Sequence, residues 1–141
     1  MRICSLISMF VVLGLASACS KTESAKPDPT DEVEAKLPAV TVDQLDTMLA
    51  SSQAQPVDAN GDLTRKKMGV IPGAVLLTDS DSINGLPADK SKALVFYCAN
   101  TACGASHHAA AKAVTAGYTN VKVLPEGIAG WVKAGKKTAS I

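Results

Sequence analysis

Hydrophobic and polar positions from residue 39 onward fall into two kinds of segment, one with helical spacing and one with short continuous runs. Between residues 42 and 49, apolar side chains recur on one face of a helix. Thr41 precedes this face and forms with Gln44 the pattern of a capping box, which marks a helix start. The pattern therefore predicts a helix in this segment.

The short apolar runs predict strands. The run at residues 93–98 is apolar at both alternations, as expected of a parallel strand that is covered on both faces. A polar loop at residues 79–92, with room for one helical turn, precedes this run. The other predicted strands are 55–59, 75–77 and 121–124.

Two further helices are predicted after the apolar run at 93–98. An alanine-rich helix over residues 106–116 stops at Gly117, and a short final helix covers residues 127–134. The small side chains of the first helix predict close packing against a sheet. Because strands and helices alternate along the chain, we expect an α/β domain, a small parallel sheet with helices on both faces.

The first eighteen residues have the pattern of an export signal. Arg2 precedes an apolar stretch over residues 3–16 that is too short to span a membrane comfortably. The small residues that follow lead into Cys19 and resemble a bacterial lipobox, in which cleavage precedes the cysteine and lipid is attached to its thiol. The alternatives are a plain signal peptide cut after Ala18 and an uncleaved anchor.

Residues 19–38 are expected to form a lipidated flexible tether, because they are polar, charged and rich in proline. The folded domain would then cover residues 39–141. Serine at the position after the cysteine, Ser20, resembles the residue found there in lipoproteins sorted to the outer membrane, if the cell is Gram-negative. We therefore expect a protein of the cell envelope that faces the periplasm and contacts the membrane through the lipid on Cys19.

Composition narrows the class of protein further. The chain has 141 residues, 47% of them hydrophobic and 19% charged, with a formal net charge of +1. This balance fits one globular domain and excludes a disordered chain and a polybasic nucleic-acid binder. With only two Phe, two Tyr and one Trp, a surface for stacking bases is not expected either. The folded domain is expected to be monomeric.

Cys98 is the first candidate for chemistry, because it is predicted to lie at the C-terminal end of a central strand and just before a helix. Ligands bind at this edge of open α/β sheets. Loop N–H groups and the helix dipole are expected there to lower the pKa of the Cys98 thiol and favour a thiolate. A thiolate attacks sulfur or phosphorus centres. The alternative is a buried cysteine that packs as a small hydrophobic side chain.

Segments on both sides of Cys98 resemble, in order, those of a rhodanese-like domain. The resemblance covers about residues 39–137, and it depends on the ordered set of segments, since none is specific alone. The matching segments are Val57-Asp58, Ile71-Pro72-Gly73-Ala74, Tyr97-Cys98, Ser106-His107-His108-Ala109-Ala110, Gly117-Tyr118, Asn120-Val121 and Gly127-Ile128-Ala129-Gly130-Trp131.

The resemblance implies a sulfurtransferase that needs no cofactor. In this family a cysteine takes a sulfane sulfur from a donor such as thiosulfate, becomes a persulfide, and passes the sulfur to an acceptor such as a thiol. By position Cys98 would be this cysteine, with Ser106 in a supporting role. Asp58, at a strand end near the same sheet edge, would either support the site by orienting the loop amides or only cap the turn at Gly61. The loop amides that would surround the persulfide belong to Ala99, Asn100, Thr101, Ala102, Cys103, Gly104 and Ala105.

Three features depart from the family pattern: the end and length of the loop, a missing histidine and a missing arginine. Ala105 stands where an arginine often ends the loop, and the loop is two residues longer than usual. Gly69-Val70 replaces a histidine, and Asn60 replaces the arginine of an Asp-x-Arg pattern. Arg65 is the only other arginine besides Arg2. Weakened oxyanion binding puts thiosulfate turnover in question and disfavours a phosphatase more strongly.

A second cysteine, Cys103, lies in the same loop. It could resolve a persulfide or sulfenic acid on Cys98 by forming a disulfide. The alternative is a permanent disulfide that braces the loop, which would stabilise little because the closed loop is short. We favour a role in sulfur or redox chemistry. A zinc site with these cysteines is not expected, since His107 and His108 are adjacent and would point about 100° apart on a helix.

The sequence therefore predicts a membrane-tethered sulfurtransferase in which Cys98 is the nucleophile and Cys103 its partner thiol. One alternative is a dithiol/disulfide or sulfane-relay protein that uses both thiols. Another is a binding module that keeps the fold without catalysis, which the missing loop arginine would allow.

Overall fold

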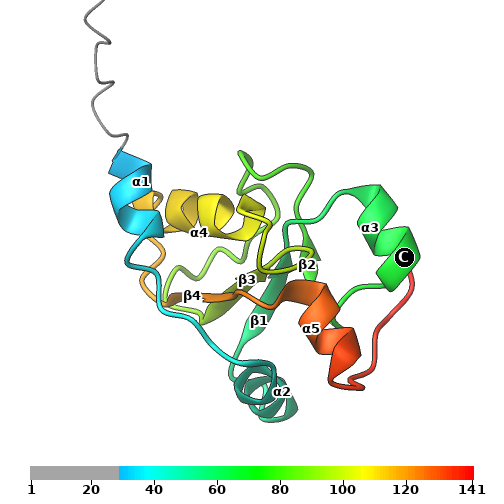
Figure 1. The fold of residues 1–141 in the computed structure, drawn as a ribbon. Coiled ribbons are helices and arrows are strands. Elements are labelled where there is room, and N and C mark those ends of the chain that lie inside the picture. The colour runs from blue at the N-terminus through cyan, green and yellow to red at the C-terminus, as the bar shows by residue number, and fades with distance from the viewer. Residues whose placement is uncertain (1–28) are drawn as a thin grey trace, which may run out of the picture.

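The computed structural model describes residues 29–141, and a parallel sheet of four strands forms the centre of this part of the chain (Figure 1). The strand order is β2-β1-β3-β4, and all three neighbouring pairs are parallel. The strands are β1 (Gln55–Asp58), β2 (Val75–Leu76), β3 (Leu94–Tyr97) and β4 (Val121–Leu124).

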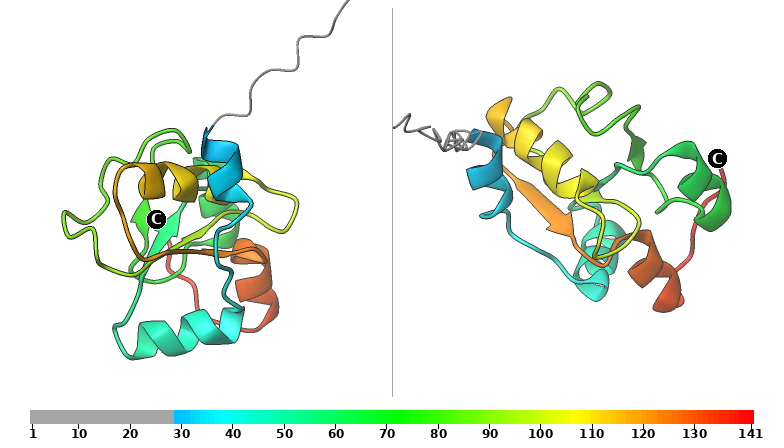
Figure 2. Two further views of the ribbon diagram at one scale, coloured as in Figure 1. Left: turned by 90° about the vertical axis from the view of Figure 1, so that its left-hand side faces the viewer. Right: turned by 45° about the horizontal axis from the view of Figure 1, so that its top comes forward.

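Helices cover both faces of the sheet (Figures 1 and 2). One face carries α1 (Pro29–Glu34) and α4 (Ala105–Thr115), and the other carries α2 (Val42–Ala50) and α5 (Gly127–Lys133). The remaining helix, α3 (Asp62–Met68), lies next to α5. The predicted α/β class, with helices on both faces of a parallel sheet, is confirmed.

Strand β3 is fully buried on both faces, as its continuous apolar run predicts. Phe96 belongs to the hydrophobic cluster under α4, whereas Val95 and Tyr97 belong to the cluster under α2 and α5. Alternate side chains of β3 thus pack against the helices on the two faces of the sheet. This packing fixes the position at which the loop after β3 begins.

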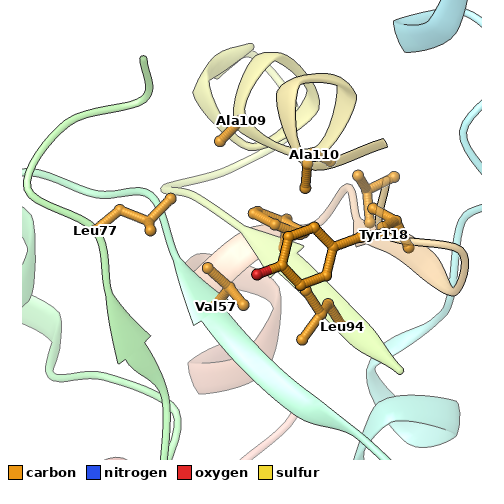
Figure 3. Packing of buried hydrophobic residues seen from close by; sticks show 10 residues of the cluster. Val57, Leu77, Leu94, Ala109, Ala110 and Tyr118 are labelled. Atoms are coloured by element: carbon orange, nitrogen blue, oxygen red, sulfur yellow. The ribbon is translucent and has the colours of Figure 1, made fainter. Parts of the chain in front are cut away.

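Small side chains let α4 approach the sheet closely. Ala109 and Ala110 point down onto Val57 and Leu94, with Tyr118 closing the side of this cluster (Figure 3). All five side chains are buried. Close packing of α4 is confirmed, and it fixes the N-terminus of this helix near the end of β3.

Helix α2 begins with the predicted capping box. The Thr41 side chain accepts a hydrogen bond from the Gln44 backbone N–H, and the Gln44 side chain accepts one from the Thr41 N–H. By contrast, the pattern of apolar positions does not predict α3, because this short helix has no periodic apolar face and leaves Leu63 86% exposed.

The structure differs from the expectation of a flexible tether at residues 29–38. Helix α1 lies side by side with α4, and Leu37 packs against the cluster under α4 (Figures 1 and 2). Pro38 O accepts a hydrogen bond from the Val123 N–H, which attaches the chain to the sheet edge. Tertiary contacts stabilise this short helix where composition alone favours disorder.

The predicted signal peptide (1–18), the lipidation site Cys19 and residues 19–28 of the predicted tether lie outside the described residues. Within residues 29–141, no helix combines the length and the apolar character that a membrane span requires.

Candidate active site

The C-terminal ends of β1 and β3 lie side by side and position the candidate site. Asp58 at the end of β1 is in register with Tyr97 at the end of β3, and Cys98 follows directly. Residues 99–104 form the loop from Cys98 to the start of α4, which we call the cysteine loop. The sheet edge predicted to bind ligands therefore carries Cys98.

The start of α5 holds the base of the cysteine loop. The Ile128 N–H donates to Cys98 O at 2.8 Å, and the Ala129 N–H donates to Ala99 O at 3.0 Å. Gly127 makes this approach possible: its φ is +61°, and a Cβ atom at this position would lie 2.4 Å from Cys98 O. The Gly-Ile segment of the sequence thus acts on the loop through the backbone.

The Cys98 thiol is buried, with 1% of the residue exposed. Its Sγ donates a hydrogen bond to Cys103 O at 3.0 Å and lies 3.3 Å from Ser106 Oγ. Burial raises the pKa of the Cys98 thiol, and interaction with Cys103 raises it further, outweighing the opposing hydrogen bonds from Ser106. The predicted lowering of this pKa is therefore wrong for the free thiol, because its surroundings favour the protonated form.

Cys103 is the more exposed and more acidic thiol of the pair. Partial burial opposes its ionisation, but hydrogen bonds from Cys98 and from the backbone N–H groups of Ala99 and Ala105 lower the pKa of the Cys103 thiol. The loop thus favours a thiolate at its second cysteine over one at the first. Both cysteines are free thiols.

The amides of the cysteine loop are partly occupied within the loop itself. Asn100 O accepts a hydrogen bond from the Cys103 N–H at 3.1 Å, and Asn100 Oδ1 accepts one from the Ala102 N–H at 3.0 Å. Gly104 O accepts the His108 N–H of α4 at 3.0 Å. Thr101 is exposed. Of the predicted amides, those of Ala99 and Ala105 contact a sulfur, and that sulfur belongs to Cys103.

Asp58 contacts its own turn and α3. Its Oδ1 accepts hydrogen bonds from the Asn60 N–H at 2.7 Å and from Arg65 Nε at 3.2 Å. Arg65, only 6% exposed, also donates through Nη2 to Asp58 O and Leu77 O. Arg65 therefore supplies from α3 the guanidinium that position 60 lacks. Sequence reasoning missed this pair, although Arg65 is the only arginine of the folded part.

The two histidines of α4 make different contacts. His108 Nδ1 lies 3.0 Å from Glu34 Oε1 of α1, and His108 Nε2 lies 2.9 Å from Asp81 Oδ1. His107 lines a pocket beside Cys103. Among residues 29–141, no group of three or more His, Cys, Asp or Glu side chains is arranged to hold a metal ion.

Comparison with known proteins adds a family. The family model described as a rhodanese-like domain matches residues 41–134, which contain the whole sheet, the cysteine loop and α5. No curated protein matches the chain in sequence.

Solved structures share this fold at low sequence identity. A protein of unknown function from Rhodopseudomonas palustris CGA009, described as a possible tyrosine phosphatase, matches with 25% identity and a TM-score of 0.64, covering 79% of this chain and 91% of that one. The rhodanese-like domain of an Anabaena protein matches with 22% identity and a TM-score of 0.62, covering 74% and 80%. A human single-domain sulfurtransferase matches with 22% identity and a TM-score of 0.57, covering 68% and 96%.

Proposed function

The chain belongs to the rhodanese-like domain family, and we propose on this basis that it is a sulfurtransferase which carries sulfane sulfur as a persulfide on Cys98. One observation carries the proposal: Cys98 follows the central strand at the ligand-binding edge of the sheet, and a second free thiol lies beside it. Sulfurtransferases are among the proteins that share this fold.

The two thiols of the cysteine loop divide the chemistry between them. The pKa of Cys98 is raised and that of Cys103 lowered, so Cys103 ionises more easily, and we assign its thiolate as the base that receives the Cys98 proton while Cys98 attacks. A thiolate formed from a thiol of high pKa is the stronger nucleophile. Cys98 is therefore the better attacking group once its proton has moved to Cys103.

The transfer step balances without an added oxidant. As Cys98 gives its proton to the Cys103 thiolate, its sulfur attacks the outer sulfur of a donor R–S–SH. The bond from Cys98 to the sulfane sulfur forms, the R–S bond to that sulfur breaks, and R–S⁻ leaves with the electron pair. An acceptor thiolate then attacks the outer sulfur of the Cys98 persulfide and returns Cys98 as the leaving thiolate.

The proximity of the two cysteines also favours a second function, a dithiol/disulfide or sulfane-relay protein. The Cys98 sulfur contacts the backbone of Cys103, and each thiol shifts the pKa of the other. Attack of Cys103 on the inner sulfur of a Cys98 persulfide would give a Cys98–Cys103 disulfide and release hydrosulfide, and a dithiol reductant would restore both thiols. A reduction potential typical of stable structural disulfides would argue against this function.

A phosphatase is disfavoured by the same geometry. The only arginine in residues 29–141 is Arg65, and its guanidinium is engaged by hydrogen bonds to Asp58 and to Leu77 O. Ala105, at the loop end, offers no bidentate group for a phosphate dianion.

We also propose that the protein is anchored in the cell envelope through lipid on Cys19 and faces the periplasm. The lipobox-like segment before Cys19 supports this location. Mass spectrometry of the protein from its native membrane tests it, since acylation on Cys19 is the expected result and an uncleaved or unmodified N-terminus would contradict it.

The test of the transferase is a labelled sulfane sulfur. The full chain is incubated with a persulfide donor that carries ³⁴S in the outer position, then digested and mapped by mass spectrometry. Label on Cys98 and transfer to cyanide or a thiol are expected. The Cys98→Ser variant should lose most of the transfer activity, and a Cys98→Ser protein as active as the wild type would overturn the role of Cys98.

A further inference from the structure

A pocket of about 450 Å³ opens between α1 and the cysteine loop. Cys103 lines this pocket, whereas Cys98 does not: Cys98 is 1% exposed and its sulfur lies against Cys103 O and Ser106. A molecule that approaches the two thiols from this side therefore meets Cys103 first. The pocket is lined by Asp31, Glu34, Ala35, Thr101, Ala102, Cys103, Gly104 and His107.

The carboxylate side chains among the residues that line this pocket have no lysine or arginine beside them in the lining. These carboxylates belong to Asp31 and Glu34 of α1. Glu34 lies 3.0 Å from His108, which holds its carboxylate at the rim of the pocket and offsets part of its negative charge when His108 is protonated. Helix α1 thus places two carboxylates beside the cysteine loop.

Two carboxylates near a reactive thiol repel an approaching anion. The repulsion grows with the charge of the substrate and is weakened by salt, because these carboxylates are partly exposed to solvent. A dianion such as thiosulfate experiences twice the repulsion of a monoanion, whereas a cation is attracted. The pocket is therefore suited to sulfur compounds without net negative charge.

We propose that this pocket is the entrance for sulfur substrates to the cysteine loop, and that Asp31 and Glu34 make it select persulfides and thiols that are neutral or cationic over dianionic donors such as thiosulfate. This inference rests on the proposed sulfurtransferase function and names the substrate class of that site. Asp31 and Glu34 act as specificity residues, and the sulfur atoms that react are those of the donor and the loop cysteines.

The first test uses probes that share one reactive group and differ only in charge. The full chain is treated with a cationic and an anionic methanethiosulfonate, and modification of Cys103 is followed by peptide mass spectrometry. The rate ratio of the cationic to the anionic reagent should be about tenfold higher for Cys103 than for a small free thiol. This difference should shrink as salt is added. A charge preference equal to that of the free thiol would overturn the proposal.

Matched variants of α1 separate the pocket from general effects on the helix. Asp31→Asn should lower the cation-to-anion rate ratio about threefold, because it removes one of the two carboxylates. Glu32→Gln is the control, since Glu32 lies in the same first turn and does not line the pocket. Equal effects of the two variants would contradict selection by the pocket.

The second test asks whether the same charge selection governs sulfur transfer. Loading of a persulfide is measured with cysteamine persulfide and with thiosulfate, and the cationic donor should load the wild type about tenfold faster at low salt. Asp31→Asn should narrow this gap, and an unchanged gap would overturn the pocket's role. If no donor loads either cysteine, the sulfurtransferase function itself fails, and the charge preference of Cys103 alone would not rescue the proposal.

Discussion

The Cys98 thiol donates a hydrogen bond to the backbone carbonyl oxygen of Cys103, 3.0 Å away. A carbonyl oxygen accepts only from the protonated thiol, so this contact stabilises the neutral form of Cys98. The same turn aims the N–H groups of Ala99 and Ala105 at the Cys103 sulfur, where they stabilise a thiolate. One turn of backbone thus gives two neighbouring cysteines opposite acid–base behaviour.

Cys103 is therefore expected to react with iodoacetamide before Cys98. Because alkylation requires the thiolate and an open path, the lowered pKa and greater exposure of Cys103 should make it faster by at least about tenfold at neutral pH. The alkylation rate of Cys98 should rise only at a pH above the pKa of an ordinary thiol. Peptide mass spectrometry after brief labelling over a pH series measures both rates.

Single-cysteine variants provide the control for this order. Cys98→Ser should keep the rapid reaction of Cys103, although loss of the Cys98 contact should shift its pKa upward. Cys103→Ser should leave Cys98 slow, because its burial does not depend on the Cys103 sulfur alone. Faster labelling of Cys98 than of Cys103 in the wild type would contradict the prediction.

Gly127→Ala should displace the cysteine loop. The added Cβ would lie 2.4 Å from Cys98 O at a φ of +61°, so either the loop or α5 must move. The backbone conformation alone should lower the free energy of unfolding by about 1–3 kcal/mol. The displaced loop should also expose Cys98, which alkylation kinetics would show as a faster reaction.

Gly135→Ala is the matched control for Gly127→Ala. Gly135 has a similar φ of +72°, but nothing lies within 4 Å of its added Cβ. It should therefore show the cost of the backbone conformation without the effect on Cys98. If both variants leave Cys98 equally protected, the close approach of Gly127 does not position the loop.

The sheet and most helices could be predicted from the sequence, because their apolar patterns are strong and local. The continuous apolar run of β3 predicts a central strand, and the alanine-rich face of α4 predicts a helix packed closely on the sheet. The placement of Cys98 at the C-terminal edge follows from these two elements. The hydrophobic pattern and the family resemblance are therefore sufficient to predict the fold and the location of the candidate site.

Features that depend on tertiary contacts were not within reach. Helix α1 has no buried residue of its own and forms because it packs against α4. Its polar sequence, taken alone, predicts a flexible segment. The pKa values of the two thiols depend on which sulfur faces the protein and which faces the loop amides. Neither spacing nor composition carries that information.

Arg65→Met should destabilise the protein strongly. Arg65 and Asp58 are 6% and 0% exposed, and removing the guanidinium leaves the Asp58 carboxylate buried without its cation. The loss of one partner of such a pair costs about 3–5 kcal/mol of unfolding free energy. Urea denaturation measures this loss, and Lys66→Met, at the exposed neighbouring position, is the control. Recovery of part of the stability in the Asp58→Asn, Arg65→Met double variant would identify the unpaired carboxylate as the cause.

Docking of α1 on α4 should weaken as the pH rises. Hydrogen bonds to Asp81 and Glu34 raise the pKa of His108 above its ordinary value of 6.5, so protonation of His108 favours the folded arrangement. This stabilisation is complete below the unfolded pKa and is lost as the pH passes through the raised folded pKa. Lys112 also contacts Asp81 at 3.2 Å, and its charge persists across this range. The effect should be small and sensitive to salt, because His108 is 38% exposed.

Hydrogen exchange of the α1 amides measures this docking directly. After correction for the intrinsic exchange rate, protection in α1 should fall between about pH 6 and pH 8, the range in which histidine releases its proton. His108→Gln should remove this pH dependence, since its side chain does not titrate. His107→Gln serves as the control, because His107 makes none of the contacts to Glu34 and Asp81. Protection that is independent of pH in the wild type, or lost equally in both variants, would show that His108 does not hold α1 beside the cysteine loop.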